Sequence, residues 1–135
     1  MNDIDPSRDP SQMRSLIARI MRSFYFAFQG ISHLFRTQRN ARIELAIGIG
    51  ACMMGAWLRI TRVEWCVVVL TIACVLILEG LNTAIEAVVD LASPHVHPLA
   101  KTAKDVAAAM VLIAAITSII IGCIVFGPRL VAHLR

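Results

Sequence analysis

Charged residues are scarce in this 135-residue chain, and several long stretches have none. They make up 16% of the sequence, against 58% for hydrophobic residues. No Asp, Glu, Lys or Arg occurs from Trp65 to Leu78 or from Val106 to Phe126. A soluble domain of this size does not need uncharged runs of this length. We therefore expect one small, all-α integral membrane domain.

Several common functional signatures are missing from the sequence. The four cysteines lie in apolar runs without CxxC or CxxxH spacing, which favours packing over disulfides or metal binding. There is no GxxxxGK[ST] loop, H-R-D catalytic loop or Gly-rich nucleotide motif, so any kinase here belongs to none of those classes. The first 15 residues are polar and acidic, so no cleavable signal peptide is expected. Without basic patches that interleave with aromatics, no nucleic-acid partner is expected either.

Hydrophobic periodicity divides the chain into a tail and four helical segments. The first helix is basic, carries several Phe at helical spacing and is expected to lie in the membrane interface, with an ordinary packed helix as the alternative. The other three are expected to span the membrane, and Gly127-Pro128 is expected to end the last of them. The expected segments are a mobile tail at 1–13, then a single domain at 14–135 with the surface helix at about 14–36 and spans at about 43–60, 63–91 and 100–127.

The distribution of Lys and Arg predicts the orientation in the membrane. The N-terminal segment and the loop after the second span together hold nine of these residues, and the opposite side holds four. Positive charge accumulates on the cytoplasmic side. The N-terminus and the loop that contains His95 and His97 are therefore expected in the cytoplasm.

Glu79, Asn82, Glu86 and Asp90 follow the uncharged run and form the main candidate site. On a helix they fall within an arc of roughly 80° and form a column about 16 Å long. Ionisable groups at the bilayer centre cost on the order of 2.5–3.5 kcal/mol each, so they default to function. A helix over the second expected span would be about 43 Å long, whereas the hydrocarbon core of a bilayer is about 30 Å thick. The column at the end of this helix would therefore lie at the depth of the lipid headgroups. The alternative is a polar cluster that only joins helices.

Carboxylates at this depth suit phosphoryl transfer to a lipid. They can ligate Mg²⁺ or take a hydroxyl proton, and Lys104 could neutralise phosphate charge. His95 and His97 are either nucleotide contacts or solvated loop residues. A different class of function is an ion or proton transporter that uses Glu79, Glu86 and Asp90 as a relay.

The polarity of the helix discriminates between these functions. The run from Trp65 to Leu78 offers only Thr71 to continue a relay, so the column is a blind pocket, as an enzyme needs. A structural assembly subunit would explain the small residues Ala114, Ser118 and Gly122 but leaves the acids unexplained.

Two motifs of the chain resemble the prokaryotic diacylglycerol kinase and undecaprenol kinase family. The first is Glu79-x-x-Asn82-Thr83-Ala84-Ile85-Glu86-x-x-x-Asp90, and the second is His97-Pro98-Leu99-Ala100-Lys101-x-Ala103-Lys104-Asp105. The likeness extends from about Ile17 to Phe126, and the second motif is closer to the undecaprenol kinase branch. It implies a homotrimer of three-span protomers in the bacterial inner membrane. Such an enzyme uses Mg²⁺ and ATP to phosphorylate undecaprenol or diacylglycerol.

The resemblance also implies roles for individual residues. Glu79 would be the general base, Glu86 would hold the metal, and Asn82 and Asp90 would support the nucleotide and metal site. Gln38 stands where the family commonly has a second metal-binding Glu, and its amide oxygen can still ligate Mg²⁺ without charge. The residues expected to contact the nucleotide are Arg19, Phe26, Asn82, Glu86, Asp90, His95, Val96, His97, Lys104 and Asp105.

Overall fold

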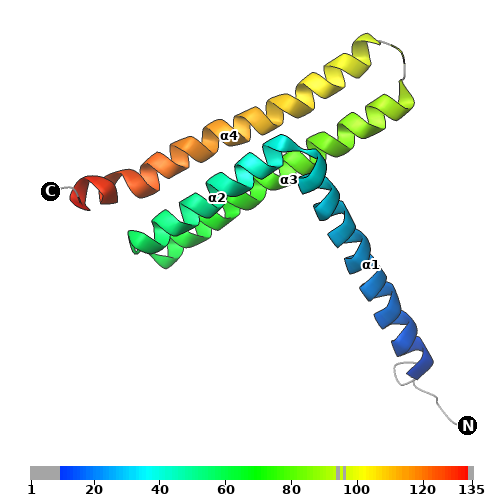
Figure 1. Cartoon of the computed structure of the whole chain (residues 1–135), viewed down its shortest axis with the longest axis horizontal. Coiled ribbons are helices and arrows are strands. Elements are labelled where there is room, and N and C mark those ends of the chain that lie inside the picture. The colour runs from blue at the N-terminus through cyan, green and yellow to red at the C-terminus, as the bar shows by residue number, and fades with distance from the viewer. Residues whose placement is uncertain (1–9, 94, 96, 134–135) are drawn as a thin grey trace, which may run out of the picture. The chain divides into compact units, whose positions relative to one another are not determined.

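The computed structural model describes residues 10–93, 95 and 97–133. This part of the chain forms four helices, so the all-α prediction is confirmed. Residues 1–9 of the expected tail lie outside the described residues. Residues 10–13 belong to the first helix, so their assignment to the tail was wrong. The helices are α1 (Pro10–Thr37), α2 (Arg39–Trp57), α3 (Arg62–Ala92) and α4 (Pro98–His133) (Figure 1).

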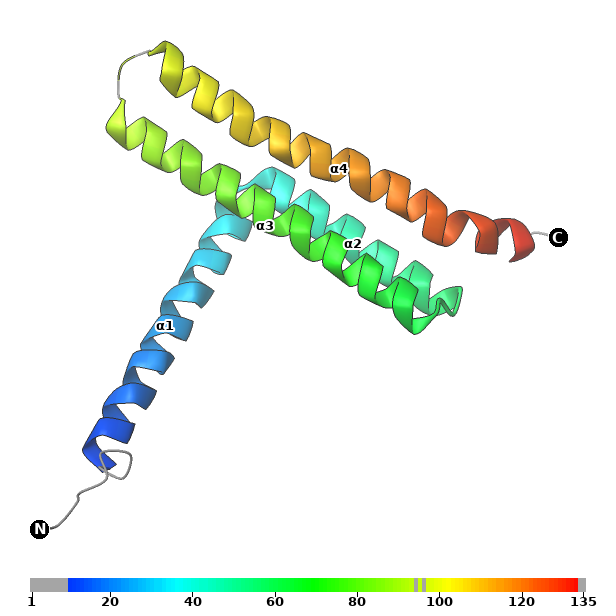
Figure 2. The ribbon, with the colours of Figure 1, turned by 180° about the vertical axis from the view of Figure 1, so that it is seen from behind.

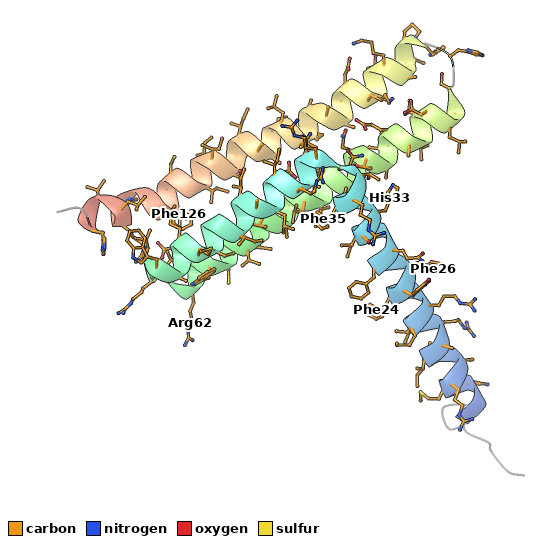
Figure 3. All side chains as sticks on the ribbon, viewed as in Figure 1. Phe24, Phe26, His33, Phe35, Arg62 and Phe126 are labelled. Carbon is orange, nitrogen blue, oxygen red and sulfur yellow. The ribbon has the colours of Figure 1, made fainter. Side chains whose placement is uncertain are left out.

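The first helix, α1, forms a unit by itself and is amphipathic. Large apolar side chains on it are exposed, among them Phe28 at 67%. Figure 3 shows Phe24 and Phe26 on different sides of the helix, so Phe26 lies off the stripe formed by Phe24 and Phe28. An exposed apolar stripe on a basic helix is typical of a helix that lies in the membrane interface.

The other three helices form a second unit in which α3 is central. It packs along α4 over most of its length and along α2 over part of it, whereas α2 and α4 contact each other little (Figures 1 and 2). By length and composition, α3 and α4 are able to cross a membrane. Their outward residues, such as Leu70 and Ile119, are large, apolar and more than 60% exposed. Surfaces of this kind suit lipid contact.

The turn between α2 and α3 is shorter than the six residues expected from the sequence, and α2 ends at Trp57 instead of near Ile60. Thr61 caps α3 through a capping box: its hydroxyl oxygen accepts from the Glu64 N–H, and its own N–H donates to Glu64 Oε2 at 2.6 Å. The Thr-x-x-Glu pattern in the sequence is the usual signal for such a start. Residues 62–64 therefore belong to the helix and not to the turn.

The expectation that Gly127-Pro128 ends the last helix is wrong. A proline removes one helical hydrogen bond, but α4 continues through Pro128 to His133. Contacts with the rest of this unit hold the final turns. Arg129 Nη2 donates to Glu64 Oε2 at 2.7 Å, and the rings of Trp57 and His133 meet edge to face with centroids 4.9 Å apart. An ion pair of this kind is charge-assisted and compensates for the bond lost at the proline.

Two glycines of α2 provide a test of the packing against α3. A Cβ at Gly55 would lie 2.9 Å from Ile60 Cδ1 and 3.3 Å from the Trp65 ring, whereas a Cβ at Gly50 meets nothing within 4 Å. Overpacking typically costs about 1–3 kcal/mol, and replacing an unhindered helical glycine by alanine is worth up to about 1 kcal/mol of stabilisation. We expect Gly55→Ala to destabilise the protein and Gly50→Ala to leave it equally or more stable.

The measurement is unfolding in mixed micelles at increasing SDS fraction, followed by circular dichroism, for wild type and both variants. Equal midpoints for Gly55→Ala and Gly50→Ala would show that the contact of Gly55 with Ile60 and Trp65 does not limit the packing of α2 on α3.

Candidate active site

The predicted column lies on the second half of α3, and its burial changes along the helix. Glu79 is 2% exposed, Asn82 and Glu86 are half-buried, and Asp90 is exposed. Helix-forming Leu, Ala, Ile and Glu continue α3 through this segment without a break, so the side chains stay on one face. The column therefore leads from a buried acid to an exposed one.

Asn82 and Glu86 form the middle of the column. Asn82 Nδ2 donates a hydrogen bond to Glu86 Oε1 at 3.2 Å. The other polar atom of this amide, Asn82 Oδ1, is buried and has no hydrogen-bond partner among the residues that the structure describes. Buried acceptors are normally paired, so this oxygen is available for a donor or a cation. Thr83 is not available in the same way, because its hydroxyl donates to the Glu79 carbonyl at 2.9 Å.

Glu44 is a fourth acid of the site, and the sequence reasoning missed it. It lies in the second turn of α2, is half-buried and is near Glu79 on the neighbouring helix α3. Its Oε2 atom is also buried, and no residue within the described ranges forms a hydrogen bond with it. A signal was present, because Glu44 directly precedes the uncharged run from Leu45 to Leu58. An acid at such a position is a functional candidate by the same rule that singled out Glu79.

Lys104 joins the exposed end of the column. Its Nζ lies 2.6 Å from Asp90 Oδ1, which connects the start of α4 to the end of α3. The structure thus brings Lys104 to the exposed end of the column, and its role as a phosphate contact stays a prediction. Asp105 is directed elsewhere and pairs with Lys101 one turn earlier on α4.

The loop that contains His95 and His97 leads into α4. His97 Nδ1 accepts from the Leu99 N–H at 3.2 Å, and the His97 carbonyl accepts from the Lys101 N–H at 3.1 Å. His97 therefore has a structural role that neither expectation for it included. The His95 carbonyl accepts from the Ser93 hydroxyl at 3.0 Å. Val96, also expected to contact the nucleotide, lies outside the described residues.

The remaining predicted residues lie before the column in the chain. Arg19 and Phe26 belong to α1, and their part in the site stays a prediction. Gln38 precedes α2 as its N-cap residue, is half-buried and makes no capping hydrogen bond with its side chain. Its amide is therefore not committed to the helix end, and its expected metal-ligand role stays a prediction too.

A magnesium site fits the donors of the column, although they are sparse. Within the described residues, no three His, Cys, Asp or Glu side chains converge as a metal cluster. Mg²⁺ does not need one, since it keeps several waters and is usually held by one or two carboxylates together with substrate phosphates. The Glu86 carboxylate and the unpartnered Asn82 Oδ1 supply the type of oxygen that this ion prefers.

The second unit thus combines two helices that are long and apolar enough to cross a membrane with an acid column that ends at the ion pair of Asp90 with Lys104. The sequence profile of the family "Prokaryotic diacylglycerol kinase" matches residues 25–126. The chain is 39% identical over 122 residues to the undecaprenol kinase of Bacillus subtilis, covering 90% of this chain and 99% of that protein.

Two diacylglycerol kinases are similar as well. That of Synechocystis is 44% identical over 110 residues, which cover 80% of this chain and 63% of that protein. That of Escherichia coli K12 is 32% identical over 106 residues, which cover 78% of this chain and 87% of that protein. The chain belongs to the prokaryotic diacylglycerol kinase family and is a membrane lipid kinase that uses ATP. The resemblance seen in the two motifs is confirmed.

Proposed function

We propose that this kinase transfers the γ-phosphoryl group of Mg-ATP to the hydroxyl of a membrane lipid alcohol, undecaprenol or diacylglycerol. One observation carries the proposal. The acid column begins at the buried Glu79 and ends at Asp90, which forms an ion pair with Lys104. A lipid hydroxyl belongs at the buried end and a nucleotide at the exposed end, and the transferred group passes between them.

At the buried end, Glu79 accepts the proton of the lipid hydroxyl. The alcohol oxygen then forms a bond to the γ-phosphorus while the bond between that phosphorus and the β,γ-bridging oxygen breaks, and ADP leaves. General bases placed in this way typically contribute about 10²–10⁴-fold to the rate. The low exposure of Glu79 keeps water away from this step and so favours the lipid alcohol over water as acceptor.

At the exposed end, Lys104 binds the phosphates. Its ammonium already lies against a carboxylate oxygen of Asp90, and a phosphate oxygen offers the same kind of partner with more charge. Glu86, Asn82 and Gln38 would hold Mg²⁺, which neutralises phosphate charge when it is bound. His95 and Asp105 would contact the nucleotide, and for Asp105 this requires that the carboxylate leave its ion pair with Lys101.

The proposed architecture is a homotrimer of three-span protomers with the active site on the cytoplasmic side of the bacterial inner membrane. The 19 residues of α2 give about 28 Å of helix, close to the core thickness of about 30 Å, which supports a third span. The excess of Lys and Arg on the N-terminal side supports the orientation. Exposed apolar residues on α3 and α4 provide surface for contacts between protomers as well as with lipid.

The test of the function is phosphate transfer from radiolabelled ATP to a panel of lipid alcohols in mixed micelles. Label is expected in the lipid fraction only when Mg²⁺ and a lipid alcohol with a free hydroxyl are both present. Absence of lipid phosphate with every alcohol tested, from protein that is folded by circular dichroism, would refute the proposal.

Gln38 allows a separate test of the metal site. If its amide is a ligand, Gln38→Glu adds a carboxylate near Glu86, and the added repulsion between acids is offset by the cation. We expect half-saturation at lower free Mg²⁺ for Gln38→Glu and at higher free Mg²⁺, with slower turnover, for Glu86→Gln. The measurement is the initial rate against free Mg²⁺ at saturating ATP. Identical half-saturation for wild type and Gln38→Glu would place Gln38 outside the metal shell.

A further inference from the structure

Four charged residues lie at the end of the helices opposite the candidate active site. Arg59 lies in the turn between α2 and α3, Arg62 and Glu64 lie in the first turn of α3, and Arg129 lies in the last turns of α4. We call these four residues the basic rim. The helix from Arg62 to Glu79 is about 26 Å long, and the hydrocarbon core of a bilayer is about 30 Å thick. With Glu79 at the depth of the headgroups on one side, the basic rim therefore lies among the headgroups on the other side.

Only part of the charge of the basic rim is compensated within the described residues. Arg129 donates to the two carboxylate oxygens of Glu64 at 2.7 and 3.3 Å and to the Arg59 carbonyl at 3.4 Å. Arg59 and Arg62 are exposed, and neither forms an ion pair with a residue that the structure describes. Figure 3 shows the Arg62 side chain directed away from the helices. The basic rim thus presents two uncompensated positive charges.

Arg59 occupies a position at which glycine would suit the backbone better. Its φ of 50° lies in the left-handed region, which glycine adopts at lower cost than arginine. The turn uses the backbone of this residue, because its N–H donates to the Ala56 carbonyl at 3.3 Å and its carbonyl accepts from Arg129. The conformation of the turn therefore does not require an arginine, and the guanidinium is available for a partner outside the chain.

An apolar groove between α3 and α4 begins at the basic rim. It consists of two hollows of about 360 and 380 Å³, which share Val67 and Ile121 in their lining. The first hollow is lined at the rim by Val63 and Glu64, and along α3 the lining of the two continues to Val75. This length of about 18 Å is close to the depth of one leaflet, which is half of the hydrocarbon core of about 30 Å. The groove therefore matches in length the apolar part of a lipid in this leaflet.

The polar side chains of the groove beyond the rim are already satisfied. The hydroxyls of Thr71 and Thr117 each donate to the backbone carbonyl four residues earlier, both at 2.8 Å. The other lining side chains beyond Glu64 are aliphatic, apart from Cys74. A surface of this kind suits contact with hydrocarbon. An apolar groove that ends at two uncompensated cations is complementary to an amphiphile with a negatively charged head.

We propose that the basic rim and this groove bind an anionic phospholipid of the leaflet opposite the active site. The phosphate binds Arg59 and Arg62, and an acyl chain lies in the groove. The site is separate from that of the kinase reaction, because it lies at the end of α3 remote from Glu79. A zwitterionic phospholipid would fill the groove equally but would add no net negative charge. An apolar helix of a second copy would also cover the groove, yet it would leave the charge of both arginines uncompensated.

Two double variants separate the charge of the basic rim from the fold of the turn. Arg59→Gly with Arg62→Gln removes both uncompensated charges, and glycine fits the backbone conformation at position 59. Arg59→Lys with Arg62→Lys is the matched control, because it keeps both charges at the same exposed positions. Circular dichroism checks that both proteins are as helical as wild type.

The probes are phosphatidylglycerol and phosphatidylcholine with identical acyl chains, one of which carries a photoreactive diazirine. Delipidated protein in mixed micelles is titrated with each probe and irradiated, and labelling is measured by mass spectrometry of the peptides that cover residues 63–75 and 114–125. Lipid attracted by the basic helix α1 labels other peptides and does not contribute. For wild type and the lysine control, we expect half-maximal labelling at about tenfold lower concentration of phosphatidylglycerol than of phosphatidylcholine. The Arg59→Gly/Arg62→Gln protein should show the same half-maximal concentration for both.

Val67→Phe tests the groove, because Val67 lines both hollows. Val69→Phe is the matched control, since it makes the same change on the same helix at an exposed residue that lines neither hollow. We expect Val67→Phe to abolish labelling of these peptides and Val69→Phe to leave it unchanged.

Equal half-maximal concentrations of the two probes in wild type would overturn the inference. So would a preference for phosphatidylglycerol that persists in the Arg59→Gly/Arg62→Gln protein, or labelling confined to peptides outside the groove. A Val67→Phe protein that loses its oligomeric state while wild type takes up no probe would overturn it as well, because a helix of a second copy would then cover the groove.

Discussion

Replacing Glu79 by glutamine should lower the turnover number about 10²–10⁴-fold while the protein still inserts and assembles. The amide has nearly the same size as the carboxylate, so it fits a position that is only 2% exposed. It cannot accept the proton of the lipid hydroxyl, however, and Asn82, the next polar residue of the column, cannot replace it as a base. The measurement is the rate of lipid phosphate formation at saturating ATP and lipid.

Glu64→Gln is the matched control for this experiment, because it makes the same change near the start of the same helix. Glu64 pairs with Arg129 at the end of α3 remote from the column, so its loss should affect stability more than turnover. A Glu79→Gln protein that keeps more than about a tenth of wild-type turnover would remove Glu79 from the role of base.

Most of the fold could be predicted from the sequence, because the apolar runs are long and their ends are marked by charge. The amphipathic helix follows from periodicity, and the positions of α2, α3 and α4 follow from their long apolar runs. The end of α4 could not be predicted in this way. Proline normally stops a helix, and the compensating contact of Arg129 with Glu64 joins residues 65 positions apart in the chain.

The column was visible in the sequence because its members share one helix. Spacing along a single helix fixes which side chains lie on the same face, so Glu79, Asn82, Glu86 and Asp90 could be grouped from their positions in the chain. Glu44 could not be grouped with them, since its approach to Glu79 depends on how α2 packs against α3.

The structure also bears on the transporter alternative. A relay from Glu79 towards the α2–α3 turn would need polar groups between the helices. The hydroxyls of Thr71 on α3 and Ser118 on α4 are bonded to the backbone of their own helices. Glu44 adds an acid at the level of Glu79 and not beyond it. The polar path within the described helices thus ends at these two acids, as a substrate site requires and an ion path does not.

Replacing Lys104 by methionine should lower the turnover number about 10²–10³-fold, the usual effect of removing one preorganised charge that stabilises a transition state. Methionine keeps the unbranched apolar stem of the side chain and removes the ammonium that now lies 2.6 Å from Asp90. Without it, the phosphates would meet the carboxylates of Asp90 and Glu86 with less compensating charge. Steady-state rates against ATP concentration should therefore show a loss in kcat as well as in kcat/KM.

Lys101→Met is the control that makes this result specific. Lys101 lies one turn before Asp105, is 76% exposed and forms its ion pair within α4. Exposed pairs of this kind contribute little, so turnover should stay within about threefold of wild type. Equal losses for the two variants would mean that general positive charge near the start of α4 attracts the nucleotide. In that case the ion pair between Lys104 and Asp90 would join two helices and would not mark the place of the phosphates.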